Sequence, residues 1–265
     1  MKILYIAWND RETKKWHPVG RLCYDNNKYI FCYTHGAKES SRFVPFGSMN
    51  DLESLYTSNE LFPLFENRIL NKSRPEFNTL LEWLDLAGEQ YDPLDVLALT
   101  EGKRGTDSLE IFPCPIVQGG IFKMSFFSHG LRYINNWASA NLDKVKAGDL
   151  LYLCPDPQNR YDSSAILLRT DDPVSFMGYC PRYLVDDFLF LLKNTDVSLI
   201  NLQVKRINPD APMRYRVLCT ISAVCPPGFA PCSQKSFKPI PEDAKLHCLL
   251  SQNSGCHLPL CSALV

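Results

Sequence analysis

A polar turn that runs into two apolar strands is the feature that most constrains how this chain folds. Between Asp156 and Ser164 the residues are mostly Pro, Asn, Asp and Ser, which favour chain reversal. Residues 165–169 and 174–179 then read as strands, and Asp171-Asp172-Pro173 between them supplies turn residues. The sequence therefore predicts a hairpin with a polar loop at its edge, where binding residues are often held.

The flanking segments predict a small β domain. Residues 122–127, 149–154, 197–207 and 213–225 read as further strands, of which 149–154 is expected to be buried. Leu184, Phe188, Leu191 and Leu192 recur at helical spacing within residues 181–194, and Trp137, Ala140 and Leu142 suggest a second, short helix. Many short strands with one or two helices suit an OB-like β-barrel in a chain of the α+β class.

Three motifs in this region resemble a HIRAN domain. The resemblance covers about residues 121–218, and we place the domain at residues 121–225. The motifs are Gly130-Leu131-Arg132-Tyr133, Asn159-x-Tyr161-Asp162-x-x-Ala165-Ile166 and Gly178-Tyr179-x-Pro181-Arg182.

The HIRAN resemblance implies a small OB-like module that binds single-stranded DNA or DNA 3′ ends. It implies that Arg132 and Tyr133 hold the terminal nucleotide and that Asp162, in the loop with Asn159 and Tyr161, receives the free 3′ hydroxyl. Chemistry is consistent with these roles, because bases stack on aromatic rings, cations follow phosphates and a carboxylate accepts hydrogen bonds from a hydroxyl group.

Each of these residues also has a purely structural interpretation. Tyr161 can anchor the loop in the core, and Asn159 and Asp162 can simply accept hydrogen bonds from loop amides. Arg182 reads as a solvated residue in the first turn of a helix, and Trp137 reads as a core residue.

The N-terminal half changes from strands to helices. Residues 3–7 and 28–33 are strand candidates, and we expect the polar stretch with His17-Pro18-Val19-Gly20 to join them. Residues 61–69 fit a helix, Ser73 and Glu76 form an apparent capping box before a second, and Asp92-Pro93 begins a third that Gly102 caps.

This order of elements resembles the N-terminal subdomain of HipA-type kinases over residues 1–112. The segments that carry the likeness are 61–68, 92–99 and 106–113. The rest of the chain lacks a Gly-rich phosphate loop and a catalytic Asp/Asn loop, so the kinase itself is not predicted. The resemblance implies instead that this module docks a separate HipA-like kinase.

Length, charge and hydrophobicity limit the number of domains, the partners and the location that we expect for this chain. With 265 residues the chain is long enough for two modest domains, and a formal net charge of −1 gives no global basic field to attract nucleic acid. Basic residues outnumber acidic ones in 121–218 but not in 1–112. The N-terminus is not typical of a signal peptide and no apolar run is long enough for a membrane span, so we expect a cytoplasmic protein.

Residues 113–120 are predicted as a linker that precedes the HIRAN domain. The C-terminal segment, residues 226–265, follows the domain and is rich in Cys and Pro. Eleven cysteines cannot all pair with one another, because their number is odd. Structural zinc is an alternative for the tail, but the spacings match no standard pair of ligand hooks, so we expect no metal or cofactor. The residues suited to zinc are Cys225, Cys232, His247, Cys248, Cys256, His257 and Cys261.

No nucleophile elbow, zinc-protease motif or Gly-rich cofactor loop is present, so the sequence predicts a non-enzymatic protein. The first hypothesis is a DNA-binding barrel whose N-terminal module docks a HipA-like kinase, as a toxin-antitoxin accessory would. The alternatives are an adaptor in DNA repair or replication and a protein-interaction module that does not bind DNA.

Overall fold

The computed structural model describes residues 2–134 and 144–241, and its contacts divide the chain into two compact units. Of the described residues, unit 1 contains 2–66, 103–114 and 233–241, and unit 2 contains 67–102, 115–134 and 144–232. Residues 1–112, which the sequence predicts as one module, are therefore divided between the two units.

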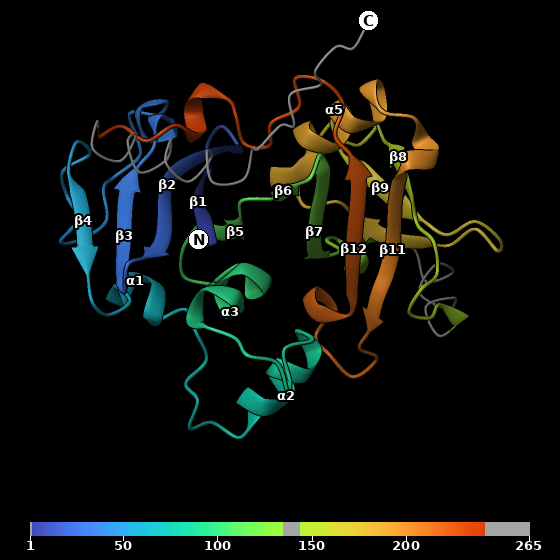
Figure 1. Ribbon diagram of the computed structural model, residues 1–265, viewed down its shortest axis with the longest axis horizontal. Helices are drawn as coiled ribbons and strands as arrows, with labels where there is room; N and C mark the ends of the chain where they lie inside the picture. The colour runs from blue at the N-terminus through green and yellow to red at the C-terminus, as the bar shows by residue number, and fades with distance from the viewer. Residues whose placement is uncertain (1, 135–143, 242–265) are drawn as a thin grey trace, which may run out of the picture. The chain divides into compact units, whose positions relative to one another are not determined.

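Unit 1 is built on one antiparallel sheet with the strand order β4-β3-β2-β1-β5 (Figure 1). Its strands are β1 (Lys2–Asp10), β2 (Lys15–Asp25), β3 (Lys28–Tyr33), β4 (Leu55–Ser58) and β5 (Leu109–Pro113). The predicted strands at 3–7 and 28–33 are present.

The expectation that His17-Pro18-Val19-Gly20 lies in a polar connection is wrong, because these residues form part of β2. This strand lies between β1 and β3 and is buried along most of its length, so it lacks the alternation that marks a half-exposed strand. A register shift pairs Ile6 with Gly20 but Ala7 with Pro18. A β-bulge of this kind is where proline is tolerated within a sheet.

Of the three predicted helices, the first two are shorter than expected, whereas the third begins at Asp92-Pro93 as predicted and has its C-cap at Glu101, one residue before Gly102. The three helices are α1 (Pro63–Glu66) in unit 1, and α2 (Glu76–Trp83) and α3 (Pro93–Thr100) in unit 2. The Ser73 capping box is not formed, because Pro75 precedes α2 and the Ser73 hydroxyl donates to Asn71 instead. A capping box is found at α3, where the Asp92 and Asp95 side chains each accept from the other's backbone amide.

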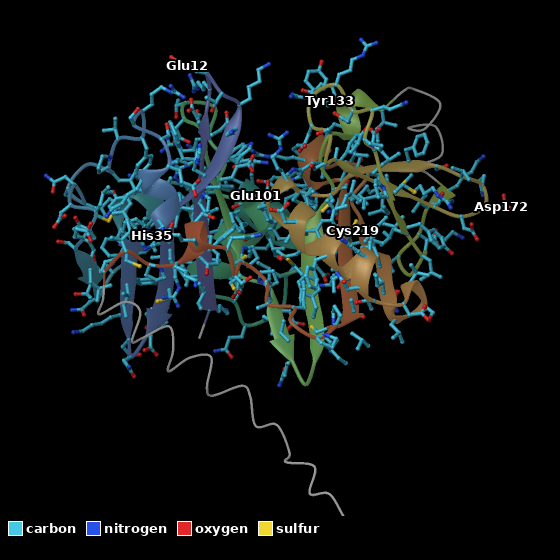
Figure 2. All side chains as sticks on the ribbon, turned by 90° about the horizontal axis from the view of Figure 1, so that it is seen from above. Glu12, His35, Glu101, Tyr133, Asp172 and Cys219 are labelled. Carbon is cyan, nitrogen blue, oxygen red and sulfur yellow. The ribbon has the colours of Figure 1, made fainter. Side chains whose placement is uncertain are left out.

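Unit 2 contains a four-stranded sheet, β11-β12-β7-β6, and a three-stranded sheet, β10-β9-β8. The strands are β6 (Ile116–Gln118), β7 (Ile121–Phe127), β8 (Tyr152–Pro155), β9 (Ile166–Arg169), β10 (Phe176–Tyr179), β11 (Ile200–Ile207) and β12 (Val217–Val224). The predicted hairpin is thus formed by β9 and β10, with Asp172 at its turn (Figure 2). Strand β6 lies in the predicted linker and pairs with β7.

Backbone hydrogen bonds join the two sheets at both ends. On one side the amides of Gly148 and Leu151 donate to Val204 and Leu202 of β11 at 2.8 Å each. On the other side, His129 after β7 and Tyr179 of β10 exchange two hydrogen bonds of 2.9 and 2.8 Å. Six strands therefore form a closed ring in the order β8, β11, β12, β7, β10, β9, which is the barrel that the sequence predicts.

One glycine is required at the second of these junctions, which we call the closing seam. Gly178 has a φ of +94°, and a Cβ added there would lie 2.6 Å from the carbonyl oxygen of His129. A side chain would push the two strands apart, so the glycine of the Gly178-Tyr179 motif has a structural reason.

The inside of the barrel is filled by apolar side chains and covered by α5 (Val185–Asn194), preceded by the short 3₁₀ helix η4 (Arg182–Leu184). The predicted helix at 181–194 is thus present, with Leu184, Phe188 and Leu191 fully buried. The predicted strand at 149–154 is shorter and less buried than expected, since β8 is half-exposed. Trp137, Ala140 and Leu142 lie outside the described residues.

The outer face of the barrel carries helix α2. Phe77, Leu80 and Leu81 pack in one apolar cluster with Phe127 and Leu218 of the barrel. Polar contacts complete the junction, because the Asn208 amide donates to the carbonyl of Trp83 at 2.9 Å and Lys205 pairs with Asp85 at 3.0 Å. This packing explains why residues 67–102 belong to the barrel unit.

Within the C-terminal segment, the structure describes residues 226–241. No group of three or more His, Cys, Asp or Glu suited to a metal ion occurs among residues 2–134 and 144–241. Of the residues suited to zinc, Cys225 and Cys232 lie in this range, whereas His247, Cys248, Cys256, His257 and Cys261 lie outside it. Within the same range, no helix is both long and apolar enough to cross a membrane.

Candidate nucleic-acid interface

The predicted binding residues lie on two segments of unit 2, the 156–165 loop between β8 and β9 and the 130–133 turn after β7. The roles of these residues in binding stay predictions. The structure shows the hydrogen-bond partners of each side chain and how much of its surface is exposed to solvent.

Asn159 shapes the loop. Its side-chain oxygen accepts hydrogen bonds from the amides of Tyr161 and Asp162, at 3.0 and 3.2 Å, and its Nδ2 donates to Asp156 at 3.1 Å. Asn159 thus satisfies loop amides, as its structural interpretation predicts, and its role in binding stays a prediction. By holding both amides, it fixes the path of the backbone through Tyr161 and Asp162.

Tyr161 is the most exposed large hydrophobic residue in the described part of the chain, with 86% of its surface accessible. The alternative in which it anchors the loop in the core is wrong. An aromatic ring that the fold leaves in solvent, next to a rigid turn, is suited to stack on a ligand.

Asp162 is held by Arg182, which the sequence predicts as a solvated residue. Its Oδ1 accepts from the amide of Ser164 at 3.0 Å, and its Oδ2 accepts from Arg182 Nε at 2.8 Å. Arg182 is thus an ion-pair partner of Asp162, and it begins η4, which follows β10 after two intervening residues. A carboxylate has about four lone-pair sites, so Asp162 can still accept a hydrogen bond from a ligand hydroxyl.

Arg132 and Tyr133 form a cation–π pair. The guanidinium carbon of Arg132 lies 4.6 Å from the centre of the Tyr133 ring, and its Nη2 donates to the Tyr133 hydroxyl. Both belong to the short 3₁₀ helix η2 (Leu131–Tyr133), which Gly130 enters with a φ of +70°. Tyr133 is 68% exposed and lies at the periphery of the unit in Figure 2.

Tyr179 joins the loop to the turn. Its backbone forms the closing seam with His129, and its hydroxyl donates to Asp156 Oδ2 at 3.3 Å. Burial and the nearby Asp156 carboxylate raise the pKa of Tyr179, which keeps its hydroxyl protonated as a donor. Its ring also lies 3.2 Å from where a Cβ on Gly130 would be, so that glycine permits the close approach.

A second connection starts from α3. Glu101 ends this helix with a left-handed backbone, φ of 58°, and is only 8% exposed. Its Oε1 lies 2.7 Å from His129 Nε2 and accepts from the Tyr183 hydroxyl at 3.0 Å. Because His129 precedes the 130–133 turn and Tyr183 follows Arg182, one carboxylate links both sides of the interface.

Tyr179 and Arg182 belong to the Gly178-Tyr179-x-Pro181-Arg182 motif, so a sequence signal marks both, although neither is predicted to contact the loop. Glu101, His129 and Tyr183 are not among the residues predicted from the sequence. No local pattern marks Glu101, because the contact with His129 spans 28 residues.

Comparison with known proteins supports the central assignment. The family model of the HIRAN domain matches residues 121–225, which confirms the predicted domain. The chain is similar to the crystal structure of the HIRAN domain of human HLTF, with 19% identity over 40% of this chain and 81% of that one and a TM-score of 0.29. It is also similar to a protein from Lactobacillus plantarum, with 19% identity over 39% of this chain and 99% of that one and a TM-score of 0.29.

These TM-scores are too low to define the fold, which rests on the strand pairing described above. No curated protein matches the chain.

Proposed function

Residues 121–225 are a HIRAN domain, and from this premise we propose that the chain binds single-stranded DNA or the 3′ end of DNA through the 130–133 turn and the 156–165 loop. The domain supplies binding and no chemistry, so the proposed role is non-enzymatic. The observation that supports this most is the pair of exposed rings, Tyr133 and Tyr161, on segments whose backbones are fixed by Tyr179 and Asn159.

The chemistry of the interface is divided between its two segments. Tyr133 with Arg132 offers a ring and a cation to the terminal base and its phosphate, and Tyr161 offers a second ring. Asp162 accepts the 3′ hydroxyl, and Arg182 beside it offsets the repulsion between the carboxylate and the nearest phosphate.

Fluorescence anisotropy with single-stranded, blunt and 3′-tailed DNA, at low and physiological salt, tests this proposal. We expect the wild-type protein to prefer a free 3′ end and to lose affinity as salt rises. We expect Asp162→Ala and the double variant Arg132→Ala/Tyr133→Ala to weaken binding by roughly 10-fold or more, as loss of a stacked base would.

Arg104→Ala is the matched control, because it removes one exposed positive charge in unit 1. Wild-type protein that does not bind any of these DNAs at low salt would contradict the proposal and favour a protein-interaction module. A 3′-phosphorylated strand that binds as well as a 3′-hydroxyl strand would contradict the role of Asp162.

For residues 1–112, which include helices α2 and α3 of unit 2, we propose docking to a HipA-like kinase, as a toxin-antitoxin accessory. The support is the sequence resemblance of residues 1–112, together with a β-sheet followed by short helices in the predicted order. Co-expression with a HipA-like kinase encoded nearby should give co-purification and reduced toxicity. If neither occurs and the neighbouring genes encode a helicase or nuclease, the role of an adaptor in DNA repair or replication is favoured instead.

A further inference from the structure

A row of two aromatic rings and one arginine crosses the outer face of the β8-β9-β10 sheet. Tyr152 of β8 and Phe176 of β10 are both directly opposite Arg169 of β9. Residues paired in this way point to the same face of a sheet. We call Tyr152, Arg169 and Phe176 the outer row.

The outer row faces solvent. Tyr152 is 39% exposed, Phe176 is 37% exposed and the Arg169 side chain is 31% exposed. Their strand neighbours Leu168 and Met177 are fully buried, so the alternation assigns the outer row to the side away from the core.

Arg169 is held over one of the two rings. Its guanidinium carbon lies 5.0 Å from the centre of the Tyr152 ring, and its Nη1 donates to the carbonyl of Thr170 at 3.0 Å. Asp171 Oδ1 lies 3.9 Å from the same nitrogen, but its side chain is 73% exposed, so water screens this pair. The outer row thus combines a cation with two ring faces.

The outer row continues the proposed interface along the same face. The next outward row consists of Cys154, Leu167 and Tyr179, and Tyr179 contacts Asp156 at the base of the 156–165 loop. Two residues along a strand span about 7 Å. This is about twice the rise per nucleotide of a stacked strand, so an unstacked single strand can place successive bases on successive rows.

We propose that the outer row is a second stacking site, which binds an internal nucleotide of the single strand whose 3′ end occupies the loop and turn. This proposal rests on the proposed function, and it specifies the ligand as a single-stranded 3′ tail of at least about three nucleotides. A blunt end, or a tail of one or two nucleotides, does not reach the outer row.

A length series of oligothymidylates with free 3′ hydroxyls, from two to eight nucleotides, tests the proposal by anisotropy or calorimetry. We expect wild-type affinity to rise between two and about five nucleotides. In Tyr152→Ala/Phe176→Ala this rise should shrink by roughly 5- to 150-fold, the range for a lost stacking contact. Binding of the dinucleotide should stay within twofold of wild type, because it occupies only the loop and turn.

Further variants separate stacking from folding and from charge. Tyr152→Leu/Phe176→Leu keeps apolar bulk without an aromatic face, and it should behave like the alanine variant if the rings stack on bases. Phe190→Ala removes an aromatic side chain of 40% exposure on α5 and should leave the series unchanged. Arg169→Gln should reduce the slope of log affinity against log salt by about 0.7 for long oligomers only.

Cross-linking locates the contact directly. A 5-iodouracil base placed third or fourth from the 3′ end should cross-link to peptides that contain Tyr152 or Phe176. A dinucleotide that binds, with a length series unchanged in both double variants and no such cross-link, would overturn the second site alone. A dinucleotide that does not bind the wild-type protein would instead contradict the proposed function.

Discussion

Two groups of aromatic side chains, one in each unit, lie in opposite environments. In unit 1, Phe31 is fully buried, with ring contacts to Tyr33, Phe46, Tyr56, Phe62 and Phe65. In unit 2, Tyr133 and Tyr161 are mostly in solvent, although the backbones beneath them are fixed. The difference indicates that rings in the first unit hold the fold together, whereas the exposed rings of the second are available to a ligand.

The largest effect on stability is expected in the unit 1 cluster. Phe31→Ala removes a ring at the centre of the cluster and should lower the free energy of unfolding by about 3–5 kcal/mol. Urea denaturation measures this loss, and Phe31→Leu should cost less because it leaves a smaller cavity. A loss below about 1 kcal/mol would contradict the assignment of this ring to the core.

Gly178→Ala at the closing seam comes next. Both the positive φ and the clash with the His129 carbonyl oppose a side chain there, so we expect a loss of about 2–4 kcal/mol. Gly228→Ala is the matched control, since Gly228 also has a positive φ, of 79°, but an added Cβ there has open space. If the two variants unfold at the same urea concentration, the close approach at the seam is not what requires glycine.

Elements with a regular burial pattern could be predicted from the sequence, whereas uniformly buried strands and contacts between distant segments could not. The β7 and hairpin strands and the buried side of α5 follow from periodicity, because each has one face in the core and one in solvent. Strand β3 follows instead from its run of apolar and aromatic residues, since residues 31–33 are all buried. Strand β2 does not follow from periodicity, because most of its successive residues are buried and they do not alternate between a buried and an exposed face. The contacts of Asp162 with Arg182 and of Glu101 with His129 join distant segments, and no local pattern encodes them.

A buried carboxyl in unit 2 predicts a pH dependence. Burial, with the nearby Asp186 charge, raises the pKa of Asp187 to about 7, against the opposing hydrogen bond from the Cys232 amide. The folded state therefore holds a proton that the unfolded state loses above pH 4, so this group's contribution to stability falls as pH rises from about 4 to 7. We expect Asp187→Asn to be more stable than wild type at pH 8 by about 1–3 kcal/mol.

Thermal unfolding of wild type and Asp187→Asn at pH 5 and pH 8 measures this dependence. The gap between the two proteins should widen at the higher pH, where wild-type Asp187 is charged and buried. A gap that is equal at both values would show that Asp187 titrates normally.

Glu101→Gln tests whether a residue outside the HIRAN match supports the interface. The amide keeps the shape but weakens the hydrogen bonds with His129 and Tyr183, so we expect about 1 kcal/mol lower stability and a several-fold loss of 3′-end affinity. Tyr183→Phe should reproduce part of this loss. Unchanged DNA binding in both variants would restrict the role of Glu101 to folding.

The smallest effect on stability is expected at Tyr161. With 86% of its surface exposed, Tyr161→Ala should change the free energy of unfolding by less than about 0.5 kcal/mol. The same variant should lose roughly 5-fold or more in DNA affinity, as measured by anisotropy. A large loss of stability with unchanged binding would remove the contrast between the two groups of aromatic residues.

The closing seam also determines at which stage of folding the proposed interface forms. His129 and Tyr179 are 50 positions apart, and their pairing brings the 130–133 turn beside the 156–165 loop. Contacts between such distant segments form late in folding, because the entropy of closing a long loop must be overcome first. A chain still being synthesised, or one whose barrel has opened, therefore has both sets of side chains but not the assembled form of the proposed binding site. A ligand bound at the proposed interface would select the closed barrel and stabilise it against unfolding.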